Sequence, residues 1–293
     1  MTSSNQETQT AVDRLLDGAI DAHVHGAPDI VPRLMTVVEV ARDGQQAGLD
    51  GVLLLNHYSE TTSQAAIVDE VVDDIMVRGG IKLNHPVGGL NPDAVEVVTE
   101  LGAAKVDMPT QHAANEFEVK GKDPEDGVSV MADGELKPEV HKILDIVAAS
   151  DATVATGHLS AEEAVAVAEA ALDHGINHPV ISHPELASIG VPIEDQKRLA
   201  DEGAVVEYCY INTTDVLHGH FDDWTPYAPE DLLEPAREVG PESVILATDF
   251  GQESNPAPSE GFRSFVGDAL EFGFSEDEVE TMLKDNPRRV YNF

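Results

Sequence analysis

The sequence predicts a (β/α)8 barrel built as one domain, and three observations lead to this fold class. Eight short apolar runs alternate with amphipathic helical segments along the 293-residue chain. Strands separated by helices pair in parallel through right-handed crossovers, and eight such units in a chain of this length fit a closed barrel. Neither a Ser/Gly-rich linker nor a shift in composition divides the chain. The alternative is an open doubly wound sheet, which rarely shows so regular an eightfold alternation.

Each predicted strand is a short apolar run followed by loop residues. Between the strands lie amphipathic segments whose apolar residues recur at helical spacing, such as TVVEVARDGQQAG and SAEEAVAVAEAALDHG. A capping box predicts one helix start at Ser160 with Glu163, and Asn91 followed by Pro92 predicts another. In chain order, the predicted strands are residues 18–25, 51–56, 80–85, 103–110, 152–158, 178–183, 204–210 and 243–249.

Two segments lie outside this alternation. Residues 1–17 are polar and are predicted to form an N-terminal extension of the barrel domain, which covers residues 18–293. Residues 113–137 form an insertion between the fourth strand and its helix, and Asp133-Gly134 within it predicts a small hairpin. Loops that follow barrel strands lie on the C-terminal face, where barrel enzymes keep their active sites. We therefore expect the insertion to cover the active site.

The chain is strongly acidic, with 55 Asp and Glu against 17 Lys and Arg and a net charge of -38. Since 42% of the residues are apolar, a full core can form and the acidity does not indicate disorder. A surface this negative repels phosphate backbones and anionic lipids, which argues against nucleic-acid and membrane binding. An acidic surface poor in lysine is typical of proteins that work in concentrated salt, so we expect a halophilic source.

The remaining composition predicts a soluble cytoplasmic protein. Cys209 is the single cysteine, which excludes a disulfide framework and a thiolate metal cluster and predicts a small buried residue. No apolar run is long enough to span a membrane, and the polar opening MTSSNQETQT lacks the features of a signal peptide. We expect a small-molecule substrate, and the apolar helix faces leave a homo-oligomer open.

Four histidines and one aspartate fall at the ends of predicted strands. His23 and His25 end the first strand, where a two-residue spacing places both imidazoles on one face. His158, His183 and Asp249 end the fifth, sixth and eighth strands. Strand ends converge at the mouth of a barrel, and neutral imidazole with carboxylate suits a divalent zinc, manganese, iron or cobalt ion. The sequence therefore predicts a metal site at the mouth, with zinc as the first choice.

These strand-end residues resemble the amidohydrolase superfamily of metal-dependent hydrolases, and the C-terminal DNPRRVYNF is similar to the Asn-Pro-x-Arg tail of many members. Further segments resemble an uncharacterised amidohydrolase-like branch of unknown function: GGLNP, MPTQHAAN, TGHLSAEEA, SHPE and TDFGQ. The likeness runs from about residue 18 to the end of the chain. It implies that Asp249 contacts the metal and serves as general acid/base. It also implies metal ligation or near-ligation for His23, His25, His158 and His183.

The fourth strand departs from the pattern of binuclear members, which carry a carboxylated lysine or a glutamate there to bridge two metals. This strand offers Lys105 and Asp107, with His112 just beyond it. Lys105 lies early in the strand, which favours a buried side chain or an exterior charge over a metal ligand. His112 is a candidate ligand or substrate contact. One metal ion is therefore favoured, and a second is left open.

The predicted function is hydrolysis of an amide, lactone or related ester bond in a small molecule. A divalent ion lowers the pKa of bound water from 15.7 towards about 7. Asp249 is expected to move the proton of the water to the leaving group, and His183 or His158 to stabilise the developing oxyanion. The alternatives are a decarboxylase with the same ligands, a phosphoester hydrolase, and a barrel that binds metal without catalysis.

Three residues are candidate substrate contacts: Arg33, His57 and His112. Arg33 follows the first strand and can clamp a carboxylate, with a surface ion pair as the alternative. His57 follows the second strand and either faces the cavity or bonds a neighbouring loop. By strand alternation, only one of Glu207 and Tyr208 faces the barrel interior.

The remaining histidines receive weaker assignments. His218 and His220 form a second His-x-His in a loop, where no strand fixes them, so the motif is a poor metal signal. His141, His174 and His178 lie on predicted helices or helix ends away from the mouth and are assigned no function.

Overall fold

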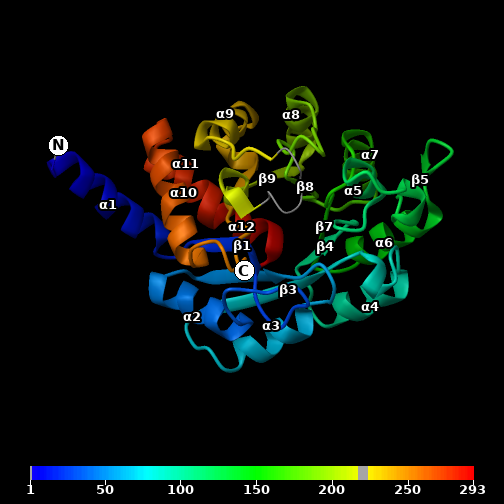
Figure 1. Cartoon of the computed structure of the whole chain (residues 1–293), viewed down its shortest axis with the longest axis horizontal. Helices are drawn as coiled ribbons and strands as arrows, with labels where there is room; N and C mark the ends of the chain where they lie inside the picture. Colours follow the sequence, from blue (N-terminus) through cyan, green and yellow to red (C-terminus); the bar gives the residue numbers. More distant parts are fainter. Residues whose placement is uncertain (1, 217–223) are drawn as a thin grey trace.

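The computed structural model describes residues 2–216 and 224–293, so His218 and His220 lie outside the described residues. Eight parallel strands follow one another in the order β1–β2–β3–β4–β7–β8–β9–β10, with helices around them (Figure 1). This arrangement confirms the predicted (β/α)8 barrel. The barrel strands are β1 Ile20–His25, β2 Gly51–Leu55, β3 Met76–Lys82, β4 Lys105–Asp107, β7 Thr153–Ala155, β8 Val180–Ser182, β9 Val205–Cys209 and β10 Val244–Ala247.

Two helices begin where the sequence places their caps. The Ser160 hydroxyl accepts from the backbone of Glu163 in a capping box, and the Asn91 side chain accepts from the backbone of Ala94. None of the helices among the described residues is long and apolar enough to cross a membrane. The α-helices are α1 Thr2–Leu16, α2 Val37–Ala47, α3 Thr62–Asp69, α4 Pro92–Glu100, α5 Ala114–Val119, α6 Pro138–Ala148, α7 Ala161–Asp173, α8 Ile193–Glu202, α9 Pro229–Val239, α10 Pro258–Phe272, α11 Glu276–Glu280 and α12 Asn286–Tyr291.

The predicted hairpin is present in the insertion after β4. Strands β5 (Met131–Ala132) and β6 (Glu135–Leu136) pair in antiparallel fashion around Asp133 and Gly134. Both turn residues have positive φ, at 53° and 82°, which a two-residue hairpin loop of this kind requires.

Two apolar clusters hold the barrel together. The larger cluster lies between the strands and the surrounding helices, and it includes Val12 and Leu15 of α1, which packs beside α10 at the left of Figure 1. The N-terminal extension is thus a helix docked on the barrel. The smaller cluster contains Leu53, Ile245 and Tyr291, so the C-terminal helix α12 contributes to the filling of the barrel interior.

The barrel closes where β1 meets the residues that follow β10. The backbone N–H of Asp249 donates to the carbonyl of His23 at 2.8 Å, and the N–H of His25 donates to the carbonyl of Phe250 at 2.8 Å. This seam joins the first and last strands of the barrel. It therefore brings together side chains that lie more than two hundred positions apart in the sequence.

Candidate functional site

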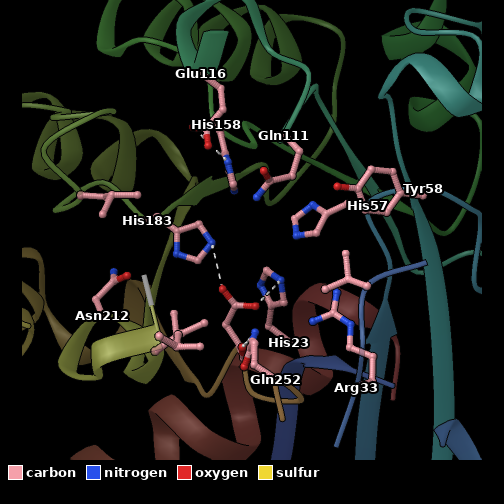
Figure 2. Close-up of a pocket in the computed structure, with 15 residues that line it drawn as sticks. His23, Arg33, His57, Tyr58, Gln111, Glu116, His158, His183, Asn212 and Gln252 are labelled. Carbon is pink, nitrogen blue, oxygen red and sulfur yellow. Dashed lines mark hydrogen bonds and ion pairs between the residues drawn. The ribbon is translucent and has the colours of Figure 1, made fainter. Parts of the chain in front are cut away.

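The seam places His23, His25 and Asp249 in contact with one another. Asp249 Oδ1 lies 2.8 Å from His25 Nε2 and 3.4 Å from His23 Nε2. Both imidazoles are buried, whereas the Asp249 side chain reaches the pocket shown in Figure 2. One ligand atom from each of the three residues lies within 4.8 Å of the others, a spacing at which all three can bind one ion.

The other ring nitrogen of each histidine is held by a hydrogen-bond acceptor. His25 Nδ1 lies 2.7 Å from the backbone carbonyl of Leu55, and His23 Nδ1 lies 2.9 Å from Glu207 Oε1. Because both partners are oxygens that accept, each Nδ1 carries the proton and each Nε2 presents a lone pair towards Asp249. Histidines that ligate metals in proteins are oriented in this way.

Two lone pairs and a carboxylate oxygen face one another here, an arrangement that a cation between them would stabilise. Burial lowers the pKa of His23 well below its usual value and also lowers the pKa of His25, so both rings are neutral near pH 7. Burial would raise the pKa of Asp249, but the adjacent histidines hold it well below its ordinary value. Neutral imidazole and ionised carboxylate are the forms that bind metal, so this donor set fits a divalent cation.

Two residues of the site have left-handed backbone conformations that non-glycine residues seldom adopt. His183 follows β8 with a φ of 48°, and Asp249 follows β10 with a φ of 56°. Such conformations persist only where the surrounding structure enforces them, and they cluster at functional sites. The turn at His183 brings its Nε2 to 3.8 Å from Asp249 Oδ2. Burial lowers the pKa of His183 to about 4, and its buried Nδ1 has no hydrogen-bond partner among the described residues.

His158 faces the same pocket from another wall (Figure 2). The preceding residue, Gly157, has a φ of 62°, and a Cβ there would lie 2.5 Å from the carbonyl oxygen of Met108. Only glycine permits this close approach, which positions the His158 backbone beyond the end of β7. The His158 ring centroid lies 5.7 Å from that of His183. His158 therefore lies near His183 but, among the described residues, is not one of the histidines that lie close to Asp249, which are His23, His25 and His183.

The insertion contributes Glu116, a buried pocket residue that the sequence analysis did not single out. Its Oε2 lies 3.5 Å from His158 Nδ1, and its Oε1 lies 2.7 Å from Lys120 Nζ. Burial would raise the pKa of Glu116, but His158 and Lys120 lower it to about 2. The Asn115 side chain donates to the carbonyls of His158 and Ser188, at 3.1 and 2.8 Å, and ties α5 to the strand ends. The insertion thus forms a wall of the pocket, as expected.

Of the predicted substrate contacts, Arg33 and His57 line the pocket, whereas His112 is not among its lining residues in the described part of the chain. The Arg33 guanidinium is held by Asp29, whose Oδ2 lies 2.8 Å from both Nε and Nη2. The Arg33 side chain is 3% exposed, so this ion pair is buried and the surface alternative does not apply. His112 packs against His85 instead, with ring centroids 5.0 Å apart.

Below the seam, buried charges fill the barrel interior. Glu207, not Tyr208, faces inward, and both of its carboxylate oxygens lie 3.0 Å from Lys105 Nζ. The Tyr291 hydroxyl also donates to Glu207, at 3.0 Å. Burial alone would lower the pKa of Lys105, but Asp107 and Glu207 hold it well above its ordinary value. Lys105 is thus an ammonium in the barrel interior. This confirms the predicted buried side chain, and the alternative prediction of an exterior charge is wrong.

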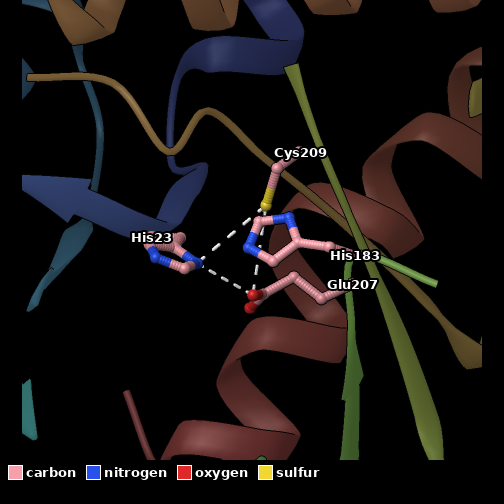
Figure 3. Close-up of side chains that lie close together, drawn as sticks. All are labelled: His23, His183, Glu207 and Cys209. Atoms are coloured by element: carbon pink, nitrogen blue, oxygen red, sulfur yellow. Dashed lines mark hydrogen bonds and ion pairs between the residues drawn. The ribbon is translucent and has the colours of Figure 1, made fainter. Parts of the chain in front are cut away.

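A second group of potential ligands, drawn in Figure 3, contains His23, His183, Glu207 and Cys209. Cys209 Sγ lies 3.9 Å from His23 Nδ1 and 4.0 Å from Glu207 Oε1. Burial raises the pKa of the Cys209 thiol well above its ordinary value, so the thiolate that a metal would need is absent near pH 7. Because Glu207 is already paired with Lys105, this group suits a divalent cation less well than the group at the seam.

Lys82, at the end of β3, is another buried residue of the site that the sequence analysis missed. Its side chain is 1% exposed, and its Nζ lies 3.3 Å from His23 Nε2 and 3.7 Å from Asp107 Oδ2. Lys82 thus lies directly beside the ring nitrogen of His23 that faces Asp249. The available signal was a lysine within the apolar run GIKLNH.

Glu185, two residues after His183, provides a prediction about stability and pH. Its Oε2 is buried without a hydrogen-bond partner among the described residues, and burial raises its pKa from 4.5 to about 8. As the pH rises from about 4.5 to about 8, the unfolded state loses this proton before the folded state does, so the folded state loses stability. Glu185→Gln, which resembles the neutral acid, is expected to remove this loss.

The measurement is the free energy of denaturant unfolding between pH 5 and pH 8 for both proteins. We expect Glu185→Gln to gain a few kcal/mol over the wild type across that range, because one pKa unit corresponds to about 1.4 kcal/mol. A difference between the two proteins that stays constant with pH would show that Glu185 is ionised throughout.

Comparison of the sequence with protein families identifies a family of unknown function (DUF6282), whose model matches residues 18–207. The chain belongs to this family. The match agrees with the resemblance to an uncharacterised branch that the motifs indicated. No curated protein shows significant sequence similarity to this DUF6282 protein.

Solved structures that resemble the DUF6282 protein include amidohydrolases. An amidohydrolase from Pseudomonas aeruginosa is 13% identical with a TM-score of 0.63, and the match covers 97% of this chain and 99% of that one. The probable dipeptidase PvdM from the same organism is 10% identical with a TM-score of 0.65 and 98% coverage of both chains. An amidohydrolase from Burkholderia multivorans with bound zinc is 13% identical, with a TM-score of 0.58 and coverage of 94% and 99%. These likenesses agree with the (β/α)8 barrel fold.

Proposed function

We propose that this DUF6282 protein is a metal-dependent hydrolase that cleaves an amide, lactone or related ester bond in a small molecule bearing a carboxylate. The observation that carries the proposal is the convergence of His23 Nε2, His25 Nε2 and Asp249, with the outer nitrogen of each ring bound to an acceptor. A divalent ion bound there would lower the pKa of water towards about 7 and polarise a substrate carbonyl. The fold shared with amidohydrolases and a probable dipeptidase supports this class of reaction.

Asp249 is the residue proposed to move the proton. Its Oδ1 faces His23 and His25, while its Oδ2 lies nearest to His183, at 3.8 Å from Nε2. The low pKa of Asp249 keeps the carboxylate ionised near pH 7, so it can accept a proton from water and return it to the leaving group.

His183 is proposed to stabilise the negative charge that develops on the substrate oxygen. With a pKa of about 4 it is neutral near pH 7 and carries one ring N–H, which can donate to an oxyanion. His158 stays the proposed ligand or near-ligand on the opposite wall, because Glu116 faces its Nδ1 and leaves Nε2 directed to the pocket.

Arg33 is proposed to bind the substrate carboxylate. Asp29 engages its Nε and Nη2 through a single oxygen, so the remaining N–H groups of the guanidinium are free to donate to a ligand in the pocket. Apolar side chains that also line the pocket favour a substrate that has an apolar portion. These side chains are Val31, Leu186, Ile211 and Val216.

His57 is proposed as a second donor to the substrate. The Thr110 hydroxyl accepts from Asn84 at 2.7 Å and lies 2.8 Å from His57 Nδ1. The Thr110 hydroxyl therefore donates its own proton to His57 Nδ1. The ring proton of His57 is then on Nε2, which is an N–H donor on the pocket side. A ring protonated at Nε2 binds substrate oxygens rather than a metal ion.

The test combines metal analysis with a paired substrate panel. Protein purified in high salt, without added metal or chelator, is analysed by mass spectrometry and then assayed on lactones, amides and esters with and without a carboxylate. We expect at least one divalent ion per chain, hydrolysis that is lost on chelation and restored by metal, and faster turnover of the carboxylated substrates. A chain that takes up no divalent ion on titration would overturn the proposal.

A decarboxylase is the second candidate, and Arg33 favours it, since a carboxylate held beside the metal can itself be lost as carbon dioxide. The same panel separates the two reactions. Release of carbon dioxide without addition of water to the substrate would favour the decarboxylase, whereas an acid and an alcohol or amine as products support hydrolysis.

Finer features of the function stay predictions. We propose zinc as the ion because imidazole and carboxylate ligands suit it, and the metal analysis identifies it directly. Adaptation to concentrated salt, a cytoplasmic location and assembly into a homo-oligomer are predictions from the sequence. Activity measured against salt concentration checks the salt adaptation, and molecular mass in solution checks the homo-oligomer.

A further inference from the structure

A chain of three polar side chains lies on the outside of the barrel, where α6 packs against α7. His141 Nδ1 lies 3.1 Å from His174 Nε2, and His174 Nδ1 lies 2.8 Å from Asp145 Oδ1. His141 and Asp145 are on α6, and His174 caps the C-terminus of α7. We propose that His141 and His174 bind a divalent metal ion at a second site, separate from the barrel mouth, with Asp145 as the acceptor that orients His174.

Asp145 determines which nitrogen of His174 can bind an ion. The carboxylate accepts, so His174 Nδ1 carries the proton and Nε2 presents a lone pair. That lone pair faces His141, whose ring centroid lies 5.4 Å away with the ring planes 29° apart. A hydrogen bond between His141 Nδ1 and His174 Nε2 holds the two rings together. A metal ion bound by both nitrogens can replace the proton of this hydrogen bond. A carboxylate behind a ligating histidine is the usual outer partner at metal sites in proteins.

The spacing and the surroundings of the pair suit a borderline divalent ion. Two imidazole nitrogens bound to tetrahedral zinc are about 3.3 Å apart, close to the 3.1 Å that separates His141 Nδ1 and His174 Nε2. A rotation of each ring would direct both lone pairs to one ion. His174 also lies at the negative end of the α7 dipole, which favours a cation. The His174 side chain is 21% exposed and that of Asp145 is 73% exposed, so an ion can enter from solvent and retain water ligands.

This site affects how the metal content of the protein is to be interpreted. Imidazole pairs bind zinc, nickel and copper, so metal analysis can find a second equivalent that has no connection with catalysis. Two ions per chain would then not require a binuclear centre at the barrel mouth. The proposal is independent of the hydrolase proposal, because it depends on residues outside the pocket.

The test is calorimetric titration of zinc into protein that has been stripped with a chelator. We expect two binding events in the wild type, a tight one from the barrel mouth and a weaker one from the surface pair. His174→Ala and His141→Ala are expected to weaken the second event by roughly tenfold or more and leave the first unchanged. Asp145→Asn is expected to weaken the second event to a smaller extent, because it removes the orienting charge but no ligand.

His178→Ala is the matched control, since His178 is a part-buried histidine whose Nδ1 lies 3.1 Å from the carbonyl of Gly203 rather than from a second imidazole. It is expected to retain both events. Imidazole 15N chemical shifts give a second readout: zinc should move the His174 Nε2 resonance in the wild type. Loss of one binding event in His141→Ala and in His174→Ala supports the proposal, whether or not the barrel mouth also binds zinc. Zinc binding that is the same in the wild type, His141→Ala and His174→Ala would overturn it.

Discussion

Replacement of Asp249 by Asn is expected to reduce hydrolysis by roughly two to four orders of magnitude, the usual contribution of a positioned acid/base. The change removes the carboxylate that would accept the proton of water, while the side chain keeps its size. It also removes the negative charge that faces His23 and His25, so metal affinity is expected to fall as well. The measurements are kcat/KM on the best substrate of the panel and zinc affinity by titration.

Asparagine is the appropriate substitution because Asp249 has a φ of 56°, a conformation that asparagine tolerates and alanine does not. The hydrogen bond from the backbone N–H of residue 249 to the carbonyl of His23 is retained, so the seam should stay closed. Glu253→Gln makes the same change of charge on an exposed residue of the same loop and should have little effect. Activity in Asp249→Asn equal to that of this control would show that Asp249 is not the acid/base.

The barrel and its rim could be predicted because their signals are local. A strand or helix is revealed by the period of its own apolar residues, and a barrel brings the ends of all its strands to one face. The residues that end β1 and follow β8 and β10 therefore had to meet, wherever they lay in the sequence. The predicted contact of His23 and His25 with Asp249 is a consequence of that topology alone.

The residues that were missed depend on packing between elements. Alternation along β9 could not decide whether Glu207 or Tyr208 faces inward, because that choice is fixed by the register of β9 against its neighbours. A lysine such as Lys82 is expected to extend towards solvent, and only the buried acid on the adjacent strand makes an interior position favourable. Glu116 lies on an insertion without a repeating pattern. The contact of His141 with His174 depends on how two helices pack.

Replacement of Glu207 by Gln is expected to weaken metal binding by roughly 10- to 100-fold, the usual effect of losing a partner that orients a metal ligand. The Glu207 carboxylate faces His23 Nδ1 at 2.9 Å and so fixes the tautomer that would present Nε2 to the proposed ion. An amide in its place is uncharged and orients the ring less strongly. Zinc affinity of the folded protein measures this effect directly.

The same substitution is expected to cost about 3–5 kcal/mol of folding stability, because it removes the nearest carboxylate of the buried Lys105 ammonium and leaves only Asp107, at 3.6 Å. Lys105→Met breaks the same ion pair from its other end and should destabilise the fold by a similar amount. It leaves the carboxylate beside His23 in place, however, so metal affinity should be unchanged or higher.

The pair of variants therefore separates the two roles of the interior charges. If Glu207 orients His23, Glu207→Gln and Lys105→Met lower the free energy of unfolding alike but differ in zinc affinity by at least about tenfold. If the ion pair only holds the barrel together, both variants should bind zinc equally well once folded. Equal affinities would reduce Glu207 to a structural role, and the orientation of His23 would then depend on the β1 backbone alone.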